Sequence, residues 1–538
     1  MAKRERIRAV DTAWLRMDRP NNLMMIIGVI IFEGRLDFER LKRTLEVRLL
    51  PYRRFRQKVR VDTTCSWWED DPEFDINHHL HRTALPGDAG KGELQDLVAE
   101  LVSSPFDQAR PLWQFHVVEN YRGGESVGTA MIMRIHHAIG DGIALIGVMN
   151  SLTDEYADAP LGEFDNSRRM DEDAEEEENN RWRLFFELEP TTNTMTAGIR
   201  FSASPWVKYL GLLKDPGQAM NHVKTVAGIA GEIAWLAAMP ADAQTRLKGT
   251  PGVSKRVTWS EPILLPEIKT VGKVFGCSVN DVLLSAVAGA LSTYLTEEGE
   301  VFGEVDIRAL VPVNLRKPGD NNKLGNEFGM VTLDLPVGID NPLARLYETR
   351  RRMEQLKHSD QAMAALTILS AAGQMPKFVQ DLVLDLLATK ASVVMTNVPG
   401  PQQTRYMAGS RIVQQMFWVP QSGNIGMGVS ILSYDGKVQI GLLTDAGMVP
   451  DPQRVIACFV PEFEKILYIL LLEPDSPNLT PEDIEAKLAP GLNRLSPADK
   501  TRKTRTARNA GRETATGVAA NSAAQETQPR NRIPKRFR

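Results

Sequence analysis

The stretch Met131–Leu145, MIMRIHHAIGDGIAL, places the adjacent histidines His136 and His137 at the end of an apolar run and an Asp-Gly pair three residues later. A neutral imidazole with a pKa near 6.5 is a natural base for removing a hydroxyl proton at neutral pH. A metal site is disfavoured, because two histidines on opposite faces and one aspartate form a poor ligand set. Catalysis and a purely structural role stay open.

The geometry of a strand separates the two histidines. Side chains alternate along an extended backbone, so His136 and His137 point to opposite faces and cannot both reach one substrate atom. We therefore expect one histidine to act chemically and the other to support it. Gly140 and Gly142 permit a sharp turn, and Asp141 lies where a loop opens a helix, as a natural N-cap. Its carboxylate could orient His137 or hold the loop by pairing with an arginine.

Several other catalytic signatures are missing from the sequence. No GxSxG nucleophile elbow occurs, and no cysteine lies beside a histidine, so a covalent acyl-enzyme has no obvious carrier. No GxxxxGK[ST] phosphate loop is found, which argues against nucleotide hydrolysis. A base without its own nucleophile indicates direct transfer between two bound substrates.

Composition excludes further classes of protein. The net charge of −4 over 538 residues does not suit nucleic-acid binding, so we expect no nucleic-acid partner. The three cysteines are isolated, which fits a reducing cytosol and gives neither a disulfide framework nor a CxxC metal signature. No apolar run reaches the roughly 18–20 residues needed to cross a bilayer. We expect a cytoplasmic protein, attached at most peripherally to a membrane or lipid droplets.

Strand-like and helix-like patterns alternate along the chain, which indicates an α/β fold. The predicted elements of the first part are a strand at Leu23–Phe32, helices at Phe38–Leu50 and Glu93–Val102, a strand at Thr129–Ile135 and a helix at Gly142–Leu152.

These patterns divide the chain into four parts. Residues 1–160 form an N-terminal domain with the histidine motif, and 256–475 form a second α/β domain. Between them, 161–255 hold an acidic stretch, Glu163–Asn180, which should be disordered, and a mainly helical connector with proline breaks. Residues 476–538 are polar and basic, and should also be disordered. This tail could attract an anionic membrane surface, pair loosely with the acidic stretch, or only solubilise the protein.

Seven motifs together resemble a known family. HHAIGDG (His136–Gly142) is similar to the HHxxxDG signature of bacterial wax ester synthase/diacylglycerol acyltransferases, within the HxxxD superfamily of chloramphenicol acetyltransferase. The other motifs are RPLW (Arg110–Trp113), SVNDVLL (Ser278–Leu284), VPVNLR (Val311–Arg316), LGNEFG (Leu324–Gly329), TNVPGP (Thr396–Pro401) and SILSYDGKVQIG (Ser430–Gly441). Their order covers about residues 10–475.

The resemblance implies a fold and a reaction. It implies two chloramphenicol-acetyltransferase-like domains with mixed sheets, flanking helices and a tunnel at their interface. His137 would be the general base that takes the proton of an acceptor hydroxyl, which then attacks acyl-CoA. His136 would support it, and Asp141, followed by Gly142, would fix the loop. Acyl-CoA is a co-substrate, the acceptor is diacylglycerol or a long-chain alcohol, and neither a cofactor nor a metal is expected.

Other motif residues are candidates for substrate binding or support. Pro111, Leu112 and Trp113 would shape either the core or a pocket. Asn280 and Asp281 match the family's Asn-Asp motif. Asn280, Asn314, Asn397 and Ser430 are unranked candidates for the donor that the tetrahedral oxyanion needs, and Arg316 completes the set.

Four alternatives are considered against this family. His136 to Asp141 also fits the HxxxxD spacing of glycerolipid acyltransferases, but no FPEGTRS-like block follows. A dihydrolipoamide acyltransferase would carry a lipoyl domain before the site, and this sequence has none there. An inactive lipid-droplet scaffold of the same fold, or an HxxxD enzyme with another acceptor, would have the same architecture; the intact motif argues against the scaffold.

Overall fold

The structure is a computed structural model that describes most of the chain outside two long segments and several short ones. The described residues are 4–62, 66–123, 127–162, 238–300, 305–316, 324–357, 361–374, 380–381 and 389–472. The predicted acidic stretch, most of the predicted connector and the basic tail lie outside these residues. All described residues belong to one compact unit, Met1–Pro477, and the domain boundaries stay predictions.

The N-terminal part of the chain forms a small sheet and most of a larger one. Its elements are β1 (Arg4–Arg6), α1 (Ala9–Met17), β2 (Met25–Phe32), α2 (Phe38–Arg48), η1 (Arg53–Arg56), β3 (Gln57–Val61), β4 (Ser66–Asp70), η2 (Ile76–His78), β5 (Leu80–Thr83), α3 (Lys91–Val102), β6 (Trp113–Tyr121), β7 (Gly128–His136) and α4 (Gly142–Ser151). The small sheet has the order β1-β4-β3.

The C-terminal part contributes a second large sheet and its helices. Its elements are β8 (Lys255–Trp259), β9 (Ile263–Leu264), α8 (Leu265–Phe275), α9 (Val279–Glu297), β10 (Ile307–Asn314), β11 (Phe328–Leu335), α10 (Pro342–Lys357), α11 (Gln361–Gln374), β12 (Val393–Pro399), β13 (Tyr406–Met407), β14 (Ser410–Trp418), β15 (Met427–Tyr434), β16 (Lys437–Asp445) and α13 (Pro452–Leu472).

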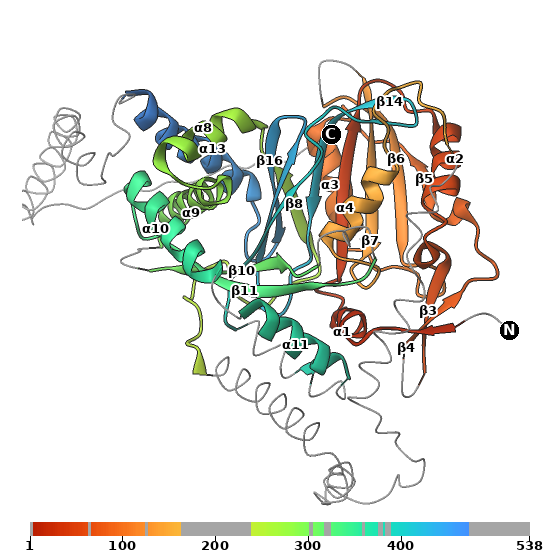
Figure 1. Ribbon diagram of the computed structural model, residues 1–538, viewed down its shortest axis with the longest axis horizontal. Helices are drawn as coiled ribbons and strands as arrows, with labels where there is room; N and C mark the ends of the chain where they lie inside the picture. The colour runs from red at the N-terminus through yellow and green to blue at the C-terminus, as the bar shows by residue number, and fades with distance from the viewer. Residues whose placement is uncertain are drawn as a thin grey trace, which may run out of the picture. The chain divides into compact units, whose positions relative to one another are not determined.

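Two mixed sheets dominate the fold. The six-stranded sheet runs β13-β14-β2-β7-β6-β5, and the seven-stranded sheet runs β11-β10-β12-β15-β16-β8 with β9 beside β16. Parallel pairs, such as β5–β6 and β12–β15, occur among antiparallel ones. Helices α8, α9, α10 and α13 gather on one side of the seven-stranded sheet (Figure 1). The predicted α/β class with mixed sheets and flanking helices is confirmed.

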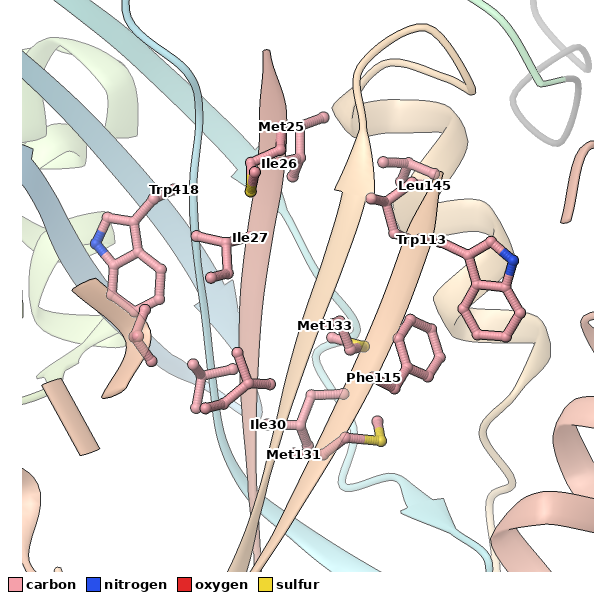
Figure 2. Packing of buried hydrophobic residues seen from close by; sticks show 14 of the residues in the cluster. Met25, Ile26, Ile27, Ile30, Trp113, Phe115, Met131, Met133, Leu145 and Trp418 are labelled. Atoms are coloured by element: carbon pink, nitrogen blue, oxygen red, sulfur yellow. The ribbon is translucent and has the colours of Figure 1, made fainter. Parts of the chain in front are cut away.

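The central strands of the six-stranded sheet are apolar because both of their faces are covered. Every residue of β2, MIIGVIIF, is buried, and so is every residue of β7. Side chains of both strands and of β6 pack on either side of the sheet (Figure 2). This rigid centre ends at the histidine motif, so the catalytic candidates extend from the best-packed part of the molecule.

Strand β14 belongs to the six-stranded sheet and also contacts the seven-stranded one, although it lies in the C-terminal part of the chain. It pairs with β2 along Ile412–Trp418. At its end, the Trp418 indole lies so close to Gly441 of β16 that a Cβ there would be 2.7 Å from the indole nitrogen. Helix α3 also packs on β8, where Gln95 Nε2 donates to Thr258 Oγ1 at 3.1 Å. The two sheets therefore share a continuous core.

The predicted strands and helices of the first part are all present, within a few residues of the expected ends. The connector differs where it can be seen. Residues 239–254 form turns and loops and no helix, so the helical prediction is wrong for this stretch. Pro240, Pro251 and two nearby glycines explain the difference, because these residues interrupt or end helices.

A buried ion pair lies where the last strand of the second sheet meets the N-terminal segment. Lys255 Nζ is 2.9 Å from Asp445 Oδ2, and the two side chains are 6% and 0% exposed. Lys255 also donates to Asn22 Oδ1 at 3.4 Å and to the Gly252 carbonyl at 3.1 Å. Burial lowers the pKa of the Lys255 ammonium, and its hydrogen bond to Asp445 opposes that effect.

Removing the carboxylate of this pair should be costly. Asp445→Asn leaves the buried Lys255 charge uncompensated, and we expect the free energy of unfolding to fall by about 3–5 kcal/mol. Urea unfolding followed by tryptophan fluorescence measures the change. The control is Glu261→Gln, whose 80%-exposed side chain pairs with Lys91 and should contribute about 0–1 kcal/mol. Equal, small changes in both variants would contradict this assessment.

Candidate active site

The two motif histidines stand at the end of β7, between β6 and β2. The His136 amide donates to the Leu112 carbonyl at 2.9 Å, whereas the His137 amide donates to the Met24 carbonyl at 2.8 Å. Since consecutive amides of a strand point in opposite directions, the extended geometry continues through His137. The two imidazoles therefore leave the sheet on opposite faces, as the sequence indicated.

The tautomer of His137 is fixed by Asn326. His137 Nδ1 lies 2.9 Å from Asn326 Oδ1. The Asn326 amide nitrogen faces two groups that can only accept, Asp11 Oδ1 at 2.7 Å and the His137 carbonyl at 2.8 Å. The amide oxygen must therefore point to Nδ1, which carries the proton. His137 Nε2 is left as an unprotonated nitrogen, which is the form that a general base requires.

The surroundings of His137 are apolar and close-fitting. The Trp14 ring stacks on the imidazole with centroids 4.0 Å apart and planes 10° apart, and Phe328 lies at 5.7 Å. The His137 side chain is buried, and this burial lowers its pKa, while the charge of Asp141, the Asn326 hydrogen bond and the charge of Asp11 act in the opposite direction. The imidazole is consequently neutral, and able to accept a proton, at neutral pH.

His136 has the opposite tautomer. Its Nδ1 accepts a hydrogen bond from the Ala138 amide at 3.1 Å, so its proton is on Nε2. Nε2 lies 3.8 Å from Asp18 Oδ2, which is too far for a hydrogen bond. Burial, assisted by the nearby His137, lowers the pKa of His136 to about 3. The accepting nitrogen of His136 is thus occupied by the backbone, and this ring is not available as a base.

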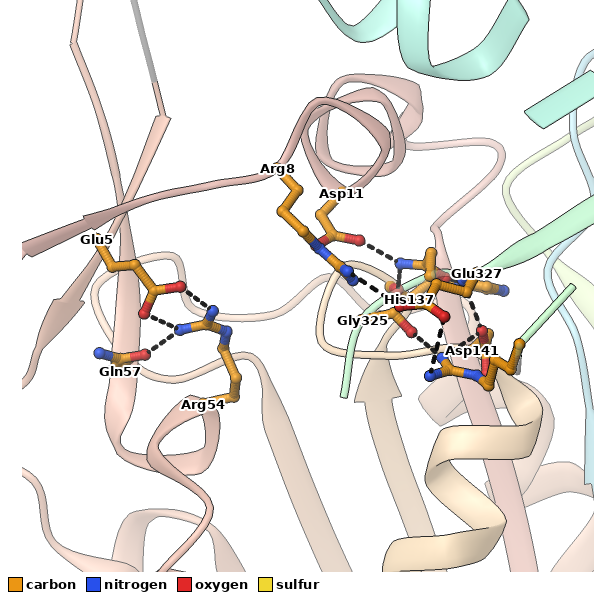
Figure 3. A network of polar contacts seen from close by, with 11 residues as sticks. Glu5, Arg8, Asp11, Arg54, Gln57, His137, Asp141, Gly325 and Glu327 are labelled. Carbon is orange, nitrogen blue, oxygen red and sulfur yellow. Dashed lines mark hydrogen bonds and ion pairs between the residues drawn. The ribbon is translucent and has the colours of Figure 1, made fainter. Parts of the chain in front are cut away.

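Asp141 uses both carboxylate oxygens to hold two loops together. Oδ1 accepts from the Ala144 amide at 2.9 Å and caps α4. Oδ2 accepts from Arg316 Nη2 at 2.7 Å and from the Glu327 amide at 3.0 Å. The Arg316 side chain is fully buried and also donates to the Gly325 carbonyl at 2.6 Å. Asp141 thus pairs with an arginine, one of the two roles considered from the sequence (Figure 3).

Gly142 follows Asp141 as the first residue of α4, and its Cα faces strand β12. A Cβ at Gly142 would lie 4.0 Å from Val398. The beginning of α4 therefore approaches the end of the second large sheet, where the residue before Val398 is Asn397.

Pro111, Leu112 and Trp113 are all buried, and their contacts are structural. The Leu112 carbonyl accepts the His136 amide, and Trp113 Nε1 donates to the Phe55 carbonyl at 2.9 Å. The Trp113 ring stacks on His79 at 4.6 Å. His79 is buried as well. The trio therefore belongs to the core and fixes the end of β7 from the β6 side.

The Asn-Asp motif begins α9. Asp281 forms a capping box with Ser278, whose amide donates to Asp281 Oδ2 at 2.7 Å. Asn280 is exposed, and its Oδ1 accepts from Asn397 Nδ2. Asn314 Oδ1 accepts from the Arg316 amide at 3.0 Å, which supports the arginine. Ser430 is buried in β15, and its hydroxyl finds no hydrogen-bond partner among the described residues. Within those residues, no hydrogen bond joins this group to either motif histidine.

Comparison with known proteins decides the family. The model of the wax ester synthase/diacylglycerol acyltransferase catalytic domain matches residues 7–283, and that of the family's C-terminal domain matches 324–467. The chain belongs to the wax ester synthase/diacylglycerol acyltransferase family. It is therefore an O-acyltransferase, as the motifs predicted.

Individual relatives agree with this membership. The chain is 27% identical over 459 residues to tgs1, named a diacylglycerol O-acyltransferase, of Mycobacterium tuberculosis, covering 82% of this chain and 91% of the relative. Two solved structures share the fold alone. The wax ester synthase/diacylglycerol acyltransferase of Marinobacter aquaeolei has a TM-score of 0.60 at 20% identity, covering 86% of this chain and 99% of that one. The trichothecene 15-O-acetyltransferase of Fusarium sporotrichioides has a TM-score of 0.53 at 12% identity, covering 86% and 95%.

Three residues that hold the family's histidine were not singled out from the sequence. Asn326 lies in the motif LGNEFG, which was noted only as a family mark, and Asp11 and Trp14 lie in α1, which carried no catalytic signal. The Asn326 and His137 positions are 189 residues apart, so their contact exists only in the folded chain. The motif itself was the one available signal.

A cavity of about 300 Å³ adjoins the site. Its lining includes Met17 and Met24 on one side and the segments 249–251 and 422–424 on the other. Met24 is also the residue whose carbonyl accepts the His137 amide. The cavity therefore shares Met24 with the backbone contacts of the histidine motif, whereas the tunnel expected from the family resemblance stays a prediction.

Two further properties concern metals and membranes. In the described parts of the chain, no three side chains of histidine, cysteine, aspartate or glutamate come together as a metal site would require. Over the same residues, no single helix has the length and hydropathy to cross a bilayer; α8 and α9 reach both only as a pair bent by 100°.

Loss of the Asp141 charge should damage structure before chemistry. In Asp141→Asn the amide nitrogen must face a donor, either the Ala144 amide or Arg316, and the buried guanidinium loses its counter-charge. We expect about 3–5 kcal/mol less unfolding free energy and reduced turnover, measured by urea unfolding and by an acyl-transfer assay. Arg316→Met should cost less, because backbone amides still satisfy the carboxylate. An inactive Asp141→Asn variant with unchanged stability would indicate a direct chemical role instead.

Proposed function

We propose that the protein transfers a long-chain acyl group from acyl-CoA to the hydroxyl of diacylglycerol or of a long-chain alcohol, with His137 as general base. The observation that carries this proposal is the unprotonated Nε2 of His137, which follows from the hydrogen bond between Nδ1 and Asn326. The acceptor is proposed from the names of the relatives and of the family. No cofactor beyond the acyl-CoA co-substrate is needed for this chemistry.

The transfer would proceed without an acyl-enzyme. His137 Nε2 removes the hydroxyl proton as the oxygen attacks the thioester carbonyl carbon, which becomes tetrahedral. When the carbon–sulfur bond breaks, the imidazolium returns the proton to the departing sulfur, and free CoA thiol and the ester product result. The intermediate imidazolium is favoured by the nearby charges of Asp141 and Asp11, which offset part of its desolvation. Asp141 itself moves no proton, because both of its oxygens are occupied.

The alternative of an inactive scaffold is disfavoured by the same geometry. A scaffold has no use for a buried His137 imidazole whose tautomer is set by Asn326, since burying polar groups in this way contributes little to stability. An HxxxD enzyme with a different acceptor would have the same base and differ only in the substrate that the assay accepts.

The two histidines should differ in their importance for turnover. His137→Ala removes the base, and we expect the rate to fall by about 10²–10⁴-fold with the fold retained. His136→Ala should cost much less, because the accepting nitrogen of His136 serves only a backbone amide. The assay combines palmitoyl-CoA with a diacylglycerol and, separately, with hexadecanol, and circular dichroism checks folding. Equal loss in two well-folded variants would refute the assignment of roles.

We also propose peripheral contact with membranes or lipid inclusions through the basic tail. The sequence beginning KTRKTRTARNAGR at Lys500 is rich in cations and poor in large apolar side chains. Each lysine or arginine near an anionic surface is attracted by about 1 kcal/mol. Such contact would bring the enzyme to its lipid substrates without altering its chemistry.

Removal of residues 500–538 should therefore weaken binding to phosphatidylserine-containing vesicles while leaving turnover on detergent-dispersed alcohol unchanged. The difference should shrink at high salt, because screening weakens attraction between exposed charges. Vesicle sedimentation at low and high salt measures the effect, with a tail whose basic residues are replaced by glutamine as control. Unchanged binding without the tail at low salt would assign attachment to another surface.

A further inference from the structure

We propose that Asp11 and Trp14 of helix α1, acting with Asn326, are positioning residues that hold the catalytic base in its reactive tautomer and orientation. This inference rests on the proposed role of His137 and adds residues that act on the base without touching the reacting atoms. It assigns a catalytic purpose to a short N-terminal helix far in sequence from both the histidine motif and Asn326.

The first step of the argument is that Asn326 cannot hold its own orientation without partners. An asparagine amide turned by half a rotation would present its nitrogen to His137 Nδ1 and its oxygen to the groups that now accept. Asp11 Oδ1, at 2.7 Å from Nδ2, prevents this, because a carboxylate cannot donate. The His137 carbonyl, at 2.8 Å, acts in the same sense. Asp11 therefore determines which atom of Asn326 faces the imidazole.

The second step is that Asp11 is itself held in place. Arg8 Nε donates to Asp11 Oδ2 at 3.0 Å, so each carboxylate oxygen has a separate donor. The Arg8 guanidinium lies against Gly325, where a Cβ would come within 1.4 Å of Nη2. Gly325 also has a φ of +102°, which favours glycine. Only a glycine before Asn326 allows α1 to approach this closely (Figure 3).

The third step concerns Trp14, one helical turn after Asp11. Its ring covers one face of the imidazole at 4.0 Å and a 10° angle, which prevents rotation about the side-chain bonds of His137. The indole N–H has no hydrogen-bond partner among the described residues, so Trp14 acts through its face alone. Asp11 and Trp14 thus constrain the same ring, one through a hydrogen-bond chain and the other through packing.

The charges around His137 give these contacts a measurable signature. Arg8 pairs with Asp11, and Arg316 pairs with Asp141. Glu327 lies near both guanidinium groups, 3.6 Å from Arg8 and 3.9 Å from Arg316, and the neutral His136 precedes the base. The negative charge of Asp11 raises the pKa of His137 against the larger lowering by burial. His137 works unprotonated, so its pKa sets the acid limb of the kcat/KM profile. Removing the Asp11 charge should lower that pKa and extend activity to lower pH.

The decisive variant is Asp11→Asn. We expect kcat to fall by about 10- to 100-fold, because the new amide allows Asn326 to turn and misplaces the base, while the acid limb moves to lower pH. Loss of stability alone would reduce the active fraction without moving the limb. The control is Asp242→Asn, which removes another buried carboxylate, one that accepts from Ser392 and the Arg308 amide. The control should lower the melting temperature and leave the limb in place.

A second pair of variants tests the chain of hydrogen bonds directly. Asn326→Asp opposes two carboxylates and should lower kcat strongly. Adding Asp11→Asn in the same chain provides a new amide to donate to the new carboxylate, so the double variant should regain part of kcat. Its acid limb should lie at higher pH than that of the wild type, since a carboxylate then accepts directly from Nδ1.

The packing role of Trp14 is tested separately. Trp14→Phe keeps an aromatic face on the ring and should retain most of the activity, whereas Trp14→Ala should not.

The outcomes separate this inference from the proposed function. An Asp11→Asn variant with kcat within about twofold of the wild type and an unmoved acid limb would overturn the positioning role, as would a limb that moves equally in Asp242→Asn. If His137→Ala keeps its activity, the proposed function fails first. An inactive His137→Ala together with a normal Asp11→Asn refutes only the inference.

Discussion

The arrangement of the site depends on the buried carboxylate of Asp141, because both of its oxygens need hydrogen-bond donors. Asp141 is almost fully buried, and a buried charge costs several kcal/mol unless it is paired and hydrogen-bonded. One oxygen is satisfied locally by the first turn of α4, but the other needs donors that its own segment lacks. Arg316 and the Glu327 amide supply them from a distant part of the chain. The loop with the histidines and the loop with Asn326 are therefore forced together, and Gly140 and Gly325 form a bridge between them.

That approach explains how two adjacent residues of the same type acquire different chemistry. His137 Nδ1 donates a hydrogen bond to the Asn326 side-chain oxygen. In His136 the same ring nitrogen instead accepts a hydrogen bond from the Ala138 amide. Both rings are buried and both pKa values are lowered, but the charges of Asp141 and Asp11 oppose the effect of burial on His137. A base that must become an imidazolium briefly needs this balance between apolar packing and nearby negative charge.

The sequence predicted what is local and could not predict what is brought together from a distance. The apolar run of β7, the Asp141 cap and the helix after it follow from short-range patterns, and each is present. The contact of His137 with Asn326, and of Asn326 with Asp11, spans 189 and 315 residues. No periodicity encodes such contacts. The helical prediction failed at 239–254 for a different reason, since Pro240, Pro251 and the glycines near them interrupt helices.

Helix α1 also connects the base to the space beside it. Asp11 and Trp14 face the imidazole, and Met17, at the end of the same helix, lines the cavity of about 300 Å³. Six residues of helix rise by about 9 Å, so one rigid element spans both places. Met24, just before β2, lines the same cavity, and its carbonyl accepts the His137 amide. One short helix therefore carries both the residues that constrain His137 and a side chain of the cavity wall.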